Sequence, residues 1–129
     1  MADKIVLVDT SILIDLFRKT DKANSVLISL VRQGYTYSIS AVTEYEIYTG
    51  ATLGQIDFWE NFLQRTEVLP FDKAVAKAAV SLNKELKHKR QLIEIADLFI
   101  AATALVNNLS FATLNKKHFE RIDGLAIIE

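Results

Sequence analysis

The chain contains no cysteine and only one proline, Pro70, among its 129 residues. Without cysteine there is no disulfide framework, no thiolate nucleophile and no zinc–thiolate site. Glycine is also scarce, with four residues, while 50% of the residues are hydrophobic, which argues against disorder and low-complexity sequence. We expect one domain, residues 1–129, with a core large enough to fold without covalent or metal crosslinks.

An excess of one charge is missing too, because 15 basic and 16 acidic residues leave a formal net charge of −1. This balance excludes a broad electrostatic footprint for nucleic acid and leaves room for a local basic patch only. The long hydrophobic runs of membrane proteins are absent as well. Asp9 interrupts the run at 5–8 too early for a signal peptide, and the run at 95–106 is too short to span a bilayer. We therefore expect a cytoplasmic protein with no membrane partner.

The order of the apolar segments predicts a parallel α/β sheet. Residues 4–8 (KIVLV) form a β-branched run, which is typical of a strand buried on both faces. Short buried strands that alternate with helices indicate a sheet with helices on both of its faces. Further strands are expected at 37–39, 67–69, 109–112 and 125–128. Helices are expected at 12–19, from Asp21 to near Gly34, at 41–49, 55–65, from Asp72 to about His88, and at 94–106.

The helix expected at 94–106 (EIADLFIAATALV) is apolar on every side after its first residue, except at Asp97 and Thr103. A helix that is apolar all round is a buried helix. Burying a lone carboxylate costs several kcal/mol unless it is paired, hydrogen-bonded or bound to a metal. Two interpretations of Asp97 are therefore open: it caps the helix or compensates its dipole, or it belongs to a cluster of functional groups.

Other polar residues follow the expected strands. Functional groups of open α/β sheets collect beyond the carboxyl ends of the strands. Asp9 directly follows the first strand, Glu46 lies in the helix after the second, and Thr113 and Asn115 follow the fourth. If Asp9, Glu46 and Asp97 converge, they raise one another's pKa values unless a hard cation neutralises them. Mg²⁺ or Mn²⁺ suits such a set better than zinc, and such a site hydrolyses phosphodiesters or transfers phosphoryl groups.

Four motifs resemble those of the PIN-domain family, and in particular its VapC-type toxins from type II toxin–antitoxin pairs. They follow one another in the family order and span nearly the whole chain: VDTSILID at 8–15, SAVTEYEIYTG at 40–50, ADLFIAATAL at 96–105 and TLNKKHF at 113–119. The resemblance implies a three-layer, Rossmann-like α/β/α fold with a short-stranded, mainly parallel sheet, and metal-dependent endoribonuclease activity on RNA. It also implies a homodimer and a cognate VapB-like antitoxin whose tail enters the active site.

The resemblance assigns roles to single residues. Asp9 matches the first family acid and Asp97 matches the third. The second family acid stands four residues before a glycine, which selects Glu46, before Gly50, rather than Glu44. The two glutamates point to different sides of the helix. Glu44 is therefore expected to be solvated or to contact a metal-ligating side chain rather than the metal itself. The residues expected to orient ligands, water or phosphate are Thr10, Ser11, Thr113 and Asn115.

The fourth motif departs from the family pattern Thr-x-Asn-x-x-Asp-Phe, because His118 stands at the position of the acid. One metal ion held by Asp9, Glu46 and Asp97 is still expected, while a second ion loses a ligand. His118 is open to three interpretations: a phosphate contact, a ligand that suits Mn²⁺ better than Mg²⁺, or a surface residue. Glu94, one turn before Asp97, either supports the site or is an ordinary first-turn acid.

Rival classes fit less well. A haloacid-dehalogenase-type phosphatase requires Asp-x-Asp, where this chain has Ser11 in the second position; a receiver domain requires an acid pair that is absent; and a histidine mechanism requires His88 and His118 to meet. The serious alternative is a catalytically weak or inactive PIN-like module that binds RNA or a partner, and the missing fourth acid motivates it.

Charged residues outside the motifs carry further expectations. The basic run at 84–90 either compensates a helix dipole in solvent or contacts RNA. Asp15 is expected to form an exposed ion pair with Arg18 or Lys19. An acidic pocket in a neutral chain also predicts capture of a basic antitoxin segment, through an arginine that competes with the metal.

Overall fold

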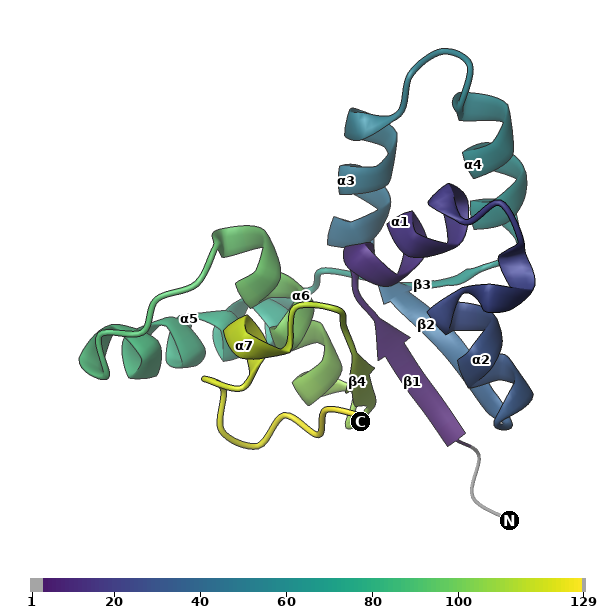
Figure 1. The fold of residues 1–129 in the computed structure, drawn as a ribbon. Coiled ribbons are helices and arrows are strands. Elements are labelled where there is room, and N and C mark those ends of the chain that lie inside the picture. Colours follow the sequence, from purple (N-terminus) through teal and green to yellow (C-terminus); the bar gives the residue numbers. More distant parts are fainter. Residues whose placement is uncertain (1–3, 129) are drawn as a thin grey trace.

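The computed structural model describes residues 4–128, in which a four-stranded parallel sheet lies between two groups of helices (Figure 1). The strands are β1 (Lys4–Val8), β2 (Tyr35–Ser40), β3 (Glu67–Leu69) and β4 (Ser110–Ala112), in the spatial order β3-β2-β1-β4. In the central strand, Leu7 is paired with Ser38 of β2 on one side and with Phe111 of β4 on the other. The parallel sheet and its flanking helices confirm the predicted α/β/α architecture.

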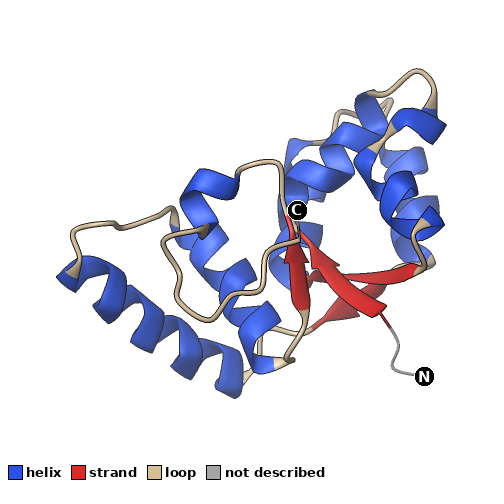
Figure 2. Cartoon of the chain, turned by 60° about the horizontal axis from the view of Figure 1, so that its bottom comes forward, coloured by secondary structure: helices blue, strands red, loops and turns tan. Residues whose placement is uncertain are grey.

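The helices cover the sheet in two layers (Figure 2). Because side chains alternate along a strand, Val6 and Val8 pack in one core with α1, α2 and α4, whereas Leu7 packs in the other with α5 and α6. Beyond the carboxyl edge of the sheet, α3 rises from the end of β2 (Figure 1). The helices are α1 (Thr10–Arg18), the 3₁₀ turn η1 (Lys22–Asn24), α2 (Val26–Arg32), α3 (Ala41–Gly50), α4 (Ile56–Gln64), α5 (Lys73–His88), α6 (Ile95–Val106) and α7 (Lys116–Phe119).

Side-chain caps set the start of the helices that follow strands. The carboxylate of Asp9 accepts the Ile12 N–H at the start of α1, and the Ser40 hydroxyl accepts the Val42 N–H at the start of α3. These caps satisfy backbone donors that have no partner within the helix. Each capped helix therefore begins at the carboxyl edge of the sheet, which is where the candidate site lies.

The expectation of a helix from Asp21 is wrong. Asp21 caps only the 3₁₀ turn η1, through the Ala23 N–H, and α2 begins at Val26 with Ser25 as its cap. The expected ion pair of Asp15 forms with Lys19, but the Asp15 side chain is only 13% exposed. Asp15 accepts the Val26 N–H at 2.9 Å and lies 3.5 Å from Lys19 Nζ. It therefore joins α1 to the first turn of α2.

The expected strand at 125–128 is a single β-bridge between Phe111 and Ile127 rather than a strand. The helix α6 also differs from the expectation of burial on every side. Ile95 is 66% exposed, and the fully buried residues of α6 begin at Leu98. No helix within residues 4–128 is both long and apolar enough to cross a membrane.

Candidate active site

Asp9 lies at the end of β1 and is 3% exposed. Its backbone N–H donates to the Ala112 carbonyl at 3.1 Å, which ties it to the end of β4. Ser11 donates its hydroxyl to Oδ1 at 2.5 Å, and Thr113 donates its hydroxyl to Oδ2 at 2.6 Å. Burial raises the pKa of the Asp9 carboxyl, and these hydrogen bonds lower it by less. Both carboxylate oxygens are therefore fixed in place.

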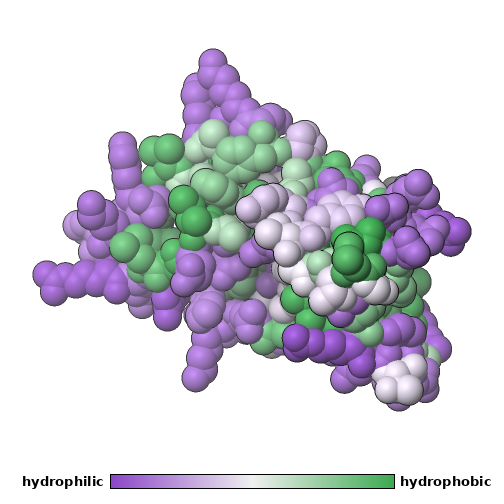
Figure 3. All heavy atoms as spheres, turned by 90° about the horizontal axis from the view of Figure 1, so that it is seen from above, coloured by the Kyte–Doolittle hydropathy of each residue, from purple (hydrophilic) through white to green (hydrophobic). Residues whose placement is uncertain are grey.

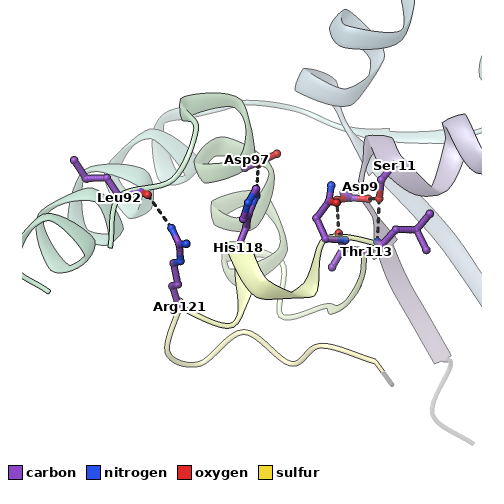
Figure 4. A network of polar contacts seen from close by, with 9 residues as sticks. Asp9, Ser11, Leu92, Asp97, Thr113, His118 and Arg121 are labelled. Atoms are coloured by element: carbon purple, nitrogen blue, oxygen red, sulfur yellow. Dashed lines mark hydrogen bonds and ion pairs between the residues drawn. The ribbon is translucent and has the colours of Figure 1, made fainter. Parts of the chain in front are cut away.

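The hydroxyls that hold Asp9 are themselves held by the segment after β4 (Figure 4). The Leu114 N–H donates to Ser11 Oγ at 3.0 Å, and the Asn115 N–H donates to Thr113 Oγ1 at 2.9 Å. Ser11 and Thr113 thus occupy the supporting positions that the sequence predicts. Asn115, also expected to orient ligands, joins this network through its backbone N–H.

Glu46 lies on α3, and its Oε1 is 2.6 Å from the Thr10 hydroxyl. The Thr10 hydroxyl is in turn 3.1 Å from the hydroxyl of Thr43, a buried residue that the sequence analysis missed. Its position three residues before Glu46, on the same face of the helix, was the available signal. Glu44 lies elsewhere: after burial, it is the next largest cause of the raised pKa of Tyr48. The two glutamates thus lie in different surroundings, as predicted.

Asp97 lies in the first turn of α6, and its side chain is 24% exposed. Burial raises the pKa of its carboxyl most, followed by the negative charges of Asp9 and Glu46, with a smaller contribution from Glu94. His118 acts in the opposite direction, and its Nδ1 lies 3.9 Å from Asp97 Oδ2. The three predicted acids therefore share one electrostatic environment, and His118 stands beside the third.

The backbone before α6 is fastened to the segment after α7 (Figure 4). Arg121 donates from Nη1 to the Leu92 carbonyl at 3.0 Å, and Lys89 forms an ion pair with Asp123 at 3.0 Å. Lys89 thus belongs to a contact within the protein, although the rest of the basic run at 84–90 extends into solvent. These contacts hold the start of α6, and hence Asp97, next to α7.

No three Asp, Glu or His side chains within residues 4–128 stand close enough together to hold a metal ion without moving. The chemistry of the donors nevertheless fits a hard cation, because the donors are carboxylate oxygens whose negative charges repel one another. Asp97 is 24% exposed, and its Oδ2 lies 3.9 Å from His118 Nδ1. Asp97 is therefore held less firmly than Asp9, whose carboxylate accepts three hydrogen bonds.

Two grooves meet at Glu46. One runs between α1, α3 and α4 and is lined by Arg18, Glu46 and Trp59 among others. The other is apolar, runs between α3, α5 and α6, and includes Phe71, Ile95 and Phe99. Viewed onto the carboxyl edge of the sheet, apolar residues gather on the α5–α6 side, with hydrophilic side chains projecting around them (Figure 3).

The sequence matches the PIN domain family over residues 6–125, and the chain belongs to this family. It is 35% identical over 127 residues to Ribonuclease VapC1 of Methanocaldococcus jannaschii, covering 96% of this chain and 87% of that protein. It is 31% identical over 122 residues to Ribonuclease VapC10 of Mycobacterium tuberculosis, covering 94% and 90%.

Among solved structures, the chain is similar to the DNA-bound VapBC of Salmonella typhimurium, with a TM-score of 0.85 at 26% identity, covering 95% of this chain and 96% of that one. These similarities confirm the predicted family and its VapC branch of toxin–antitoxin proteins.

Proposed function

We propose that this protein is a VapC-type endoribonuclease that hydrolyses RNA phosphodiester bonds with one Mg²⁺ or Mn²⁺ ion held by Asp9, Glu46 and Asp97. The observation that carries the proposal is electrostatic. Carboxylates from β1, α3 and α6 lie close enough for Asp9 and Glu46 to raise the pKa of Asp97. Such mutual repulsion is relieved by a cation at their centre, and the names of the relatives support a nuclease.

Each side chain of the site has a separate role in this proposal. When bound, the metal ion supplies an activated water and polarises the phosphate. Asp9 presents oxygens that Ser11 and Thr113 hold in one orientation. Thr10 orients Glu46 through its hydroxyl. Asp97, which lies 3.9 Å from His118, would be the third carboxylate ligand of the ion.

The partners follow from the grooves and from the relatives. The solved VapBC structures to which the chain is similar support a VapB-like antitoxin. The groove with Arg18 and Glu46 leads to the acidic site, so we infer that an antitoxin arginine enters it and competes with the metal. The apolar groove at Phe71 and Ile95 supports a homodimer, because exposed apolar patches mark interfaces. An RNA substrate implies a cytoplasmic location.

A second candidate is a PIN-like module that binds RNA or its partner without cutting. Two observations favour it: His118 replaces the fourth acid, and residues 4–128 contain no preformed three-ligand cluster. The two candidates differ in one measurable property, which is metal-dependent cleavage.

The test is cleavage of a panel of labelled RNAs by antitoxin-free protein in Mg²⁺, Mn²⁺ or chelator, with Asp97→Asn beside the wild type. We expect metal-dependent cutting that falls more than about 100-fold in Asp97→Asn, because even residues that only orient a ligand contribute roughly 10–100-fold. Asp57→Asn, which changes an exposed aspartate in the first turn of α4, is the matched control and should cut normally.

Cutting that survives both chelator and Asp97→Asn would contradict the proposed site. Absence of cutting, together with absence of Mg²⁺ binding in calorimetry, would favour the module that binds without cutting. Cutting lost equally in Asp97→Asn and Asp57→Asn would indicate a general defect of folding rather than loss of a ligand.

A further inference from the structure

A third cavity, separate from the two grooves at Glu46, is lined by one continuous segment, residues 114–118. Both ends of this segment reach the candidate site. Near its start, the Leu114 N–H donates to the Ser11 hydroxyl that holds Asp9. At its end, the His118 imidazole lies 3.9 Å from Asp97 (Figure 4). Any molecule in this cavity would therefore adjoin a phosphate that sits at the acids.

The charge of the segment is opposite to that of the acids. Its sequence, LNKKH, contains two lysines and a histidine and no acidic residue. Lys117 is exposed, and no ion pair joins it to another residue within 4–128. Lys19 and Lys89 differ in this respect, because they are paired with Asp15 and Asp123. The charge of Lys117 is thus available to an anion from outside.

We propose that this cavity binds a phosphate of the RNA next to the one that is cut, with Lys117 as its main positive contact. The inference rests on the proposed function and adds a place for the rest of the substrate. A cation at the three acids would compensate the scissile phosphate, but the neighbouring phosphate would still face the negative field of Glu94 and the site acids. Lysine is suited to this task because its ammonium group is a compact point charge that pairs with phosphate in any orientation.

The residue at position 118 fits the same role. An aspartate there, as in the family pattern, would place a carboxylate in the wall of the phosphate cavity. His118 instead offers ring nitrogens on a half-exposed side chain, which can donate to a phosphate oxygen. The departure from the family motif thus exchanges an acid for a residue compatible with the backbone of the RNA.

The test is binding of a labelled single-stranded RNA in chelator, where no metal-dependent cutting occurs, over a range of salt concentrations. Lys117→Gln should weaken binding several-fold at low salt and reduce the slope of log affinity against log salt by about 0.7, which corresponds to one lost phosphate contact on a single strand. Lys77→Gln, at an exposed position of α5, is the matched control and should leave the slope unchanged.

A chemical change in the RNA locates the contact. Replacing one phosphate with an uncharged methylphosphonate, on either side of the cleavage position, should weaken binding to the wild type. At one position this loss should be absent in Lys117→Gln, because the contact is already gone. In cleavage assays with metal, Lys117→Gln should raise KM and leave kcat nearly unchanged, as expected for a contact made equally before and during the reaction.

The outcomes separate this inference from the proposed function. A wild type that cuts RNA, together with a Lys117→Gln variant of unchanged salt slope and KM, would overturn the phosphate site alone. A wild type that binds RNA through Lys117 without cutting it would support the phosphate site and overturn the nuclease. A wild type that neither binds nor cuts any RNA would overturn both.

Discussion

Asp9 and Asp97 carry the same side chain in two different surroundings. Asp9 is 3% exposed and accepts hydrogen bonds from two hydroxyls and one backbone N–H. Asp97 is 24% exposed, and His118 Nδ1 lies 3.9 Å from its Oδ2. Both carboxyl groups have a raised pKa, with burial as the main cause; hydrogen bonds offset part of the rise at Asp9, whereas the charges of Asp9 and Glu46 add to it at Asp97.

The difference separates a fixed part of the site from an adjustable part. Hydrogen bonds that fix a ligand in advance reduce the reorganisation needed when its partner arrives. Asp9 has this support from α1 and from Thr113 after β4, whereas Asp97, in the first turn of α6, is partly exposed and has the long contact to His118. We expect Asp9 to define where a cation sits and Asp97 to respond to its arrival.

Among changes that leave the three acids in place, the largest effect is expected when the support of Asp9 is removed. Thr113→Val keeps the shape of the side chain but deletes the hydroxyl that donates to Asp9 Oδ2. Cleavage, measured as kcat/KM at saturating Mg²⁺, should fall about 10–100-fold, as is usual for residues that orient a metal ligand. Thr36→Val, on an exposed position of β2, controls for loss of a hydroxyl alone. Equal activity of Thr113→Val and wild type would mean that Asp9 does not need this support.

A smaller effect, about tenfold in Mg²⁺ affinity or 1.4 kcal/mol, is expected from adding a negative charge next to Asp97. His118→Asp adds a fourth carboxylate beside it, which raises the pKa of Asp97 further and increases the gain from a cation. Calorimetry should therefore detect tighter Mg²⁺ binding. His88→Asp, at the last residue of α5, is the control. Weaker binding of Mg²⁺ in His118→Asp would indicate that His118 itself is a ligand.

The raised pKa of Asp97 also has a consequence for the metal-free protein. Because its folded-state pKa lies above the ordinary value of 3.8, the stability that Asp97 contributes is fully present below that pH and is lost as pH rises through the raised value. In chelator at neutral pH, Asp97→Asn should therefore unfold at a higher temperature than the wild type, and the gap should close towards acidic pH.

Thermal unfolding with Asp57→Asn as a control would check this sign. A lower melting temperature of Asp97→Asn at neutral pH in chelator would contradict it. Addition of Mg²⁺ should remove or reverse the advantage of the variant, because a ligand that binds the folded wild type stabilises it by mass action.

The smallest effect concerns a second matched pair of side chains, Ser38 and Ser40, which lie on the same strand. Both are buried, yet Ser40 caps α3 through the Val42 N–H, whereas the Ser38 hydroxyl has no hydrogen-bond partner in the described part of the chain. Ser40→Ala should destabilise the protein by about 1 kcal/mol. Ser38→Ala should be neutral or stabilise it by up to about 1 kcal/mol, since it removes an unsatisfied buried group. Denaturant unfolding of both variants would decide, and a loss of stability in Ser38→Ala would reveal a hidden partner.

Features that depend on neighbouring residues were predictable from the sequence. The helices expected at 41–49 and from Asp72 begin next to polar residues of the sequence, and Ser40 and Asp72 cap them. The strand ends that bring Asp9 and Thr113 to one edge of the sheet follow from the parallel order of the strands. The contact between Asp9 and Thr113 is therefore implied by the pattern of the chain.

Features that depend on distant residues were not predictable. The start of α2 is fixed by Asp15 from α1, which accepts the Val26 N–H, and no local signal indicates this contact. The first turn of α6 is apolar yet exposed at Ile95, because it faces the groove beside Phe71 rather than the core. Hydropathy cannot distinguish a buried apolar face from one exposed for a partner. The roles of Asp9, Glu46, Asp97 and His118 at a metal stay predictions.

The pairing of Phe111 with the last described residues bears on how this protein can be handled. Since β4 is an edge of the sheet, the outward N–H and C=O of Phe111 would otherwise be open to a strand from another molecule. Within the chain, Ala126 and Ile128 occupy both groups at 2.8 Å. A variant shortened after Leu125 would therefore carry an uncovered β-edge and should aggregate more readily. An affinity tag is therefore better placed at the N-terminal end of the chain, before β1, than at the C-terminal end.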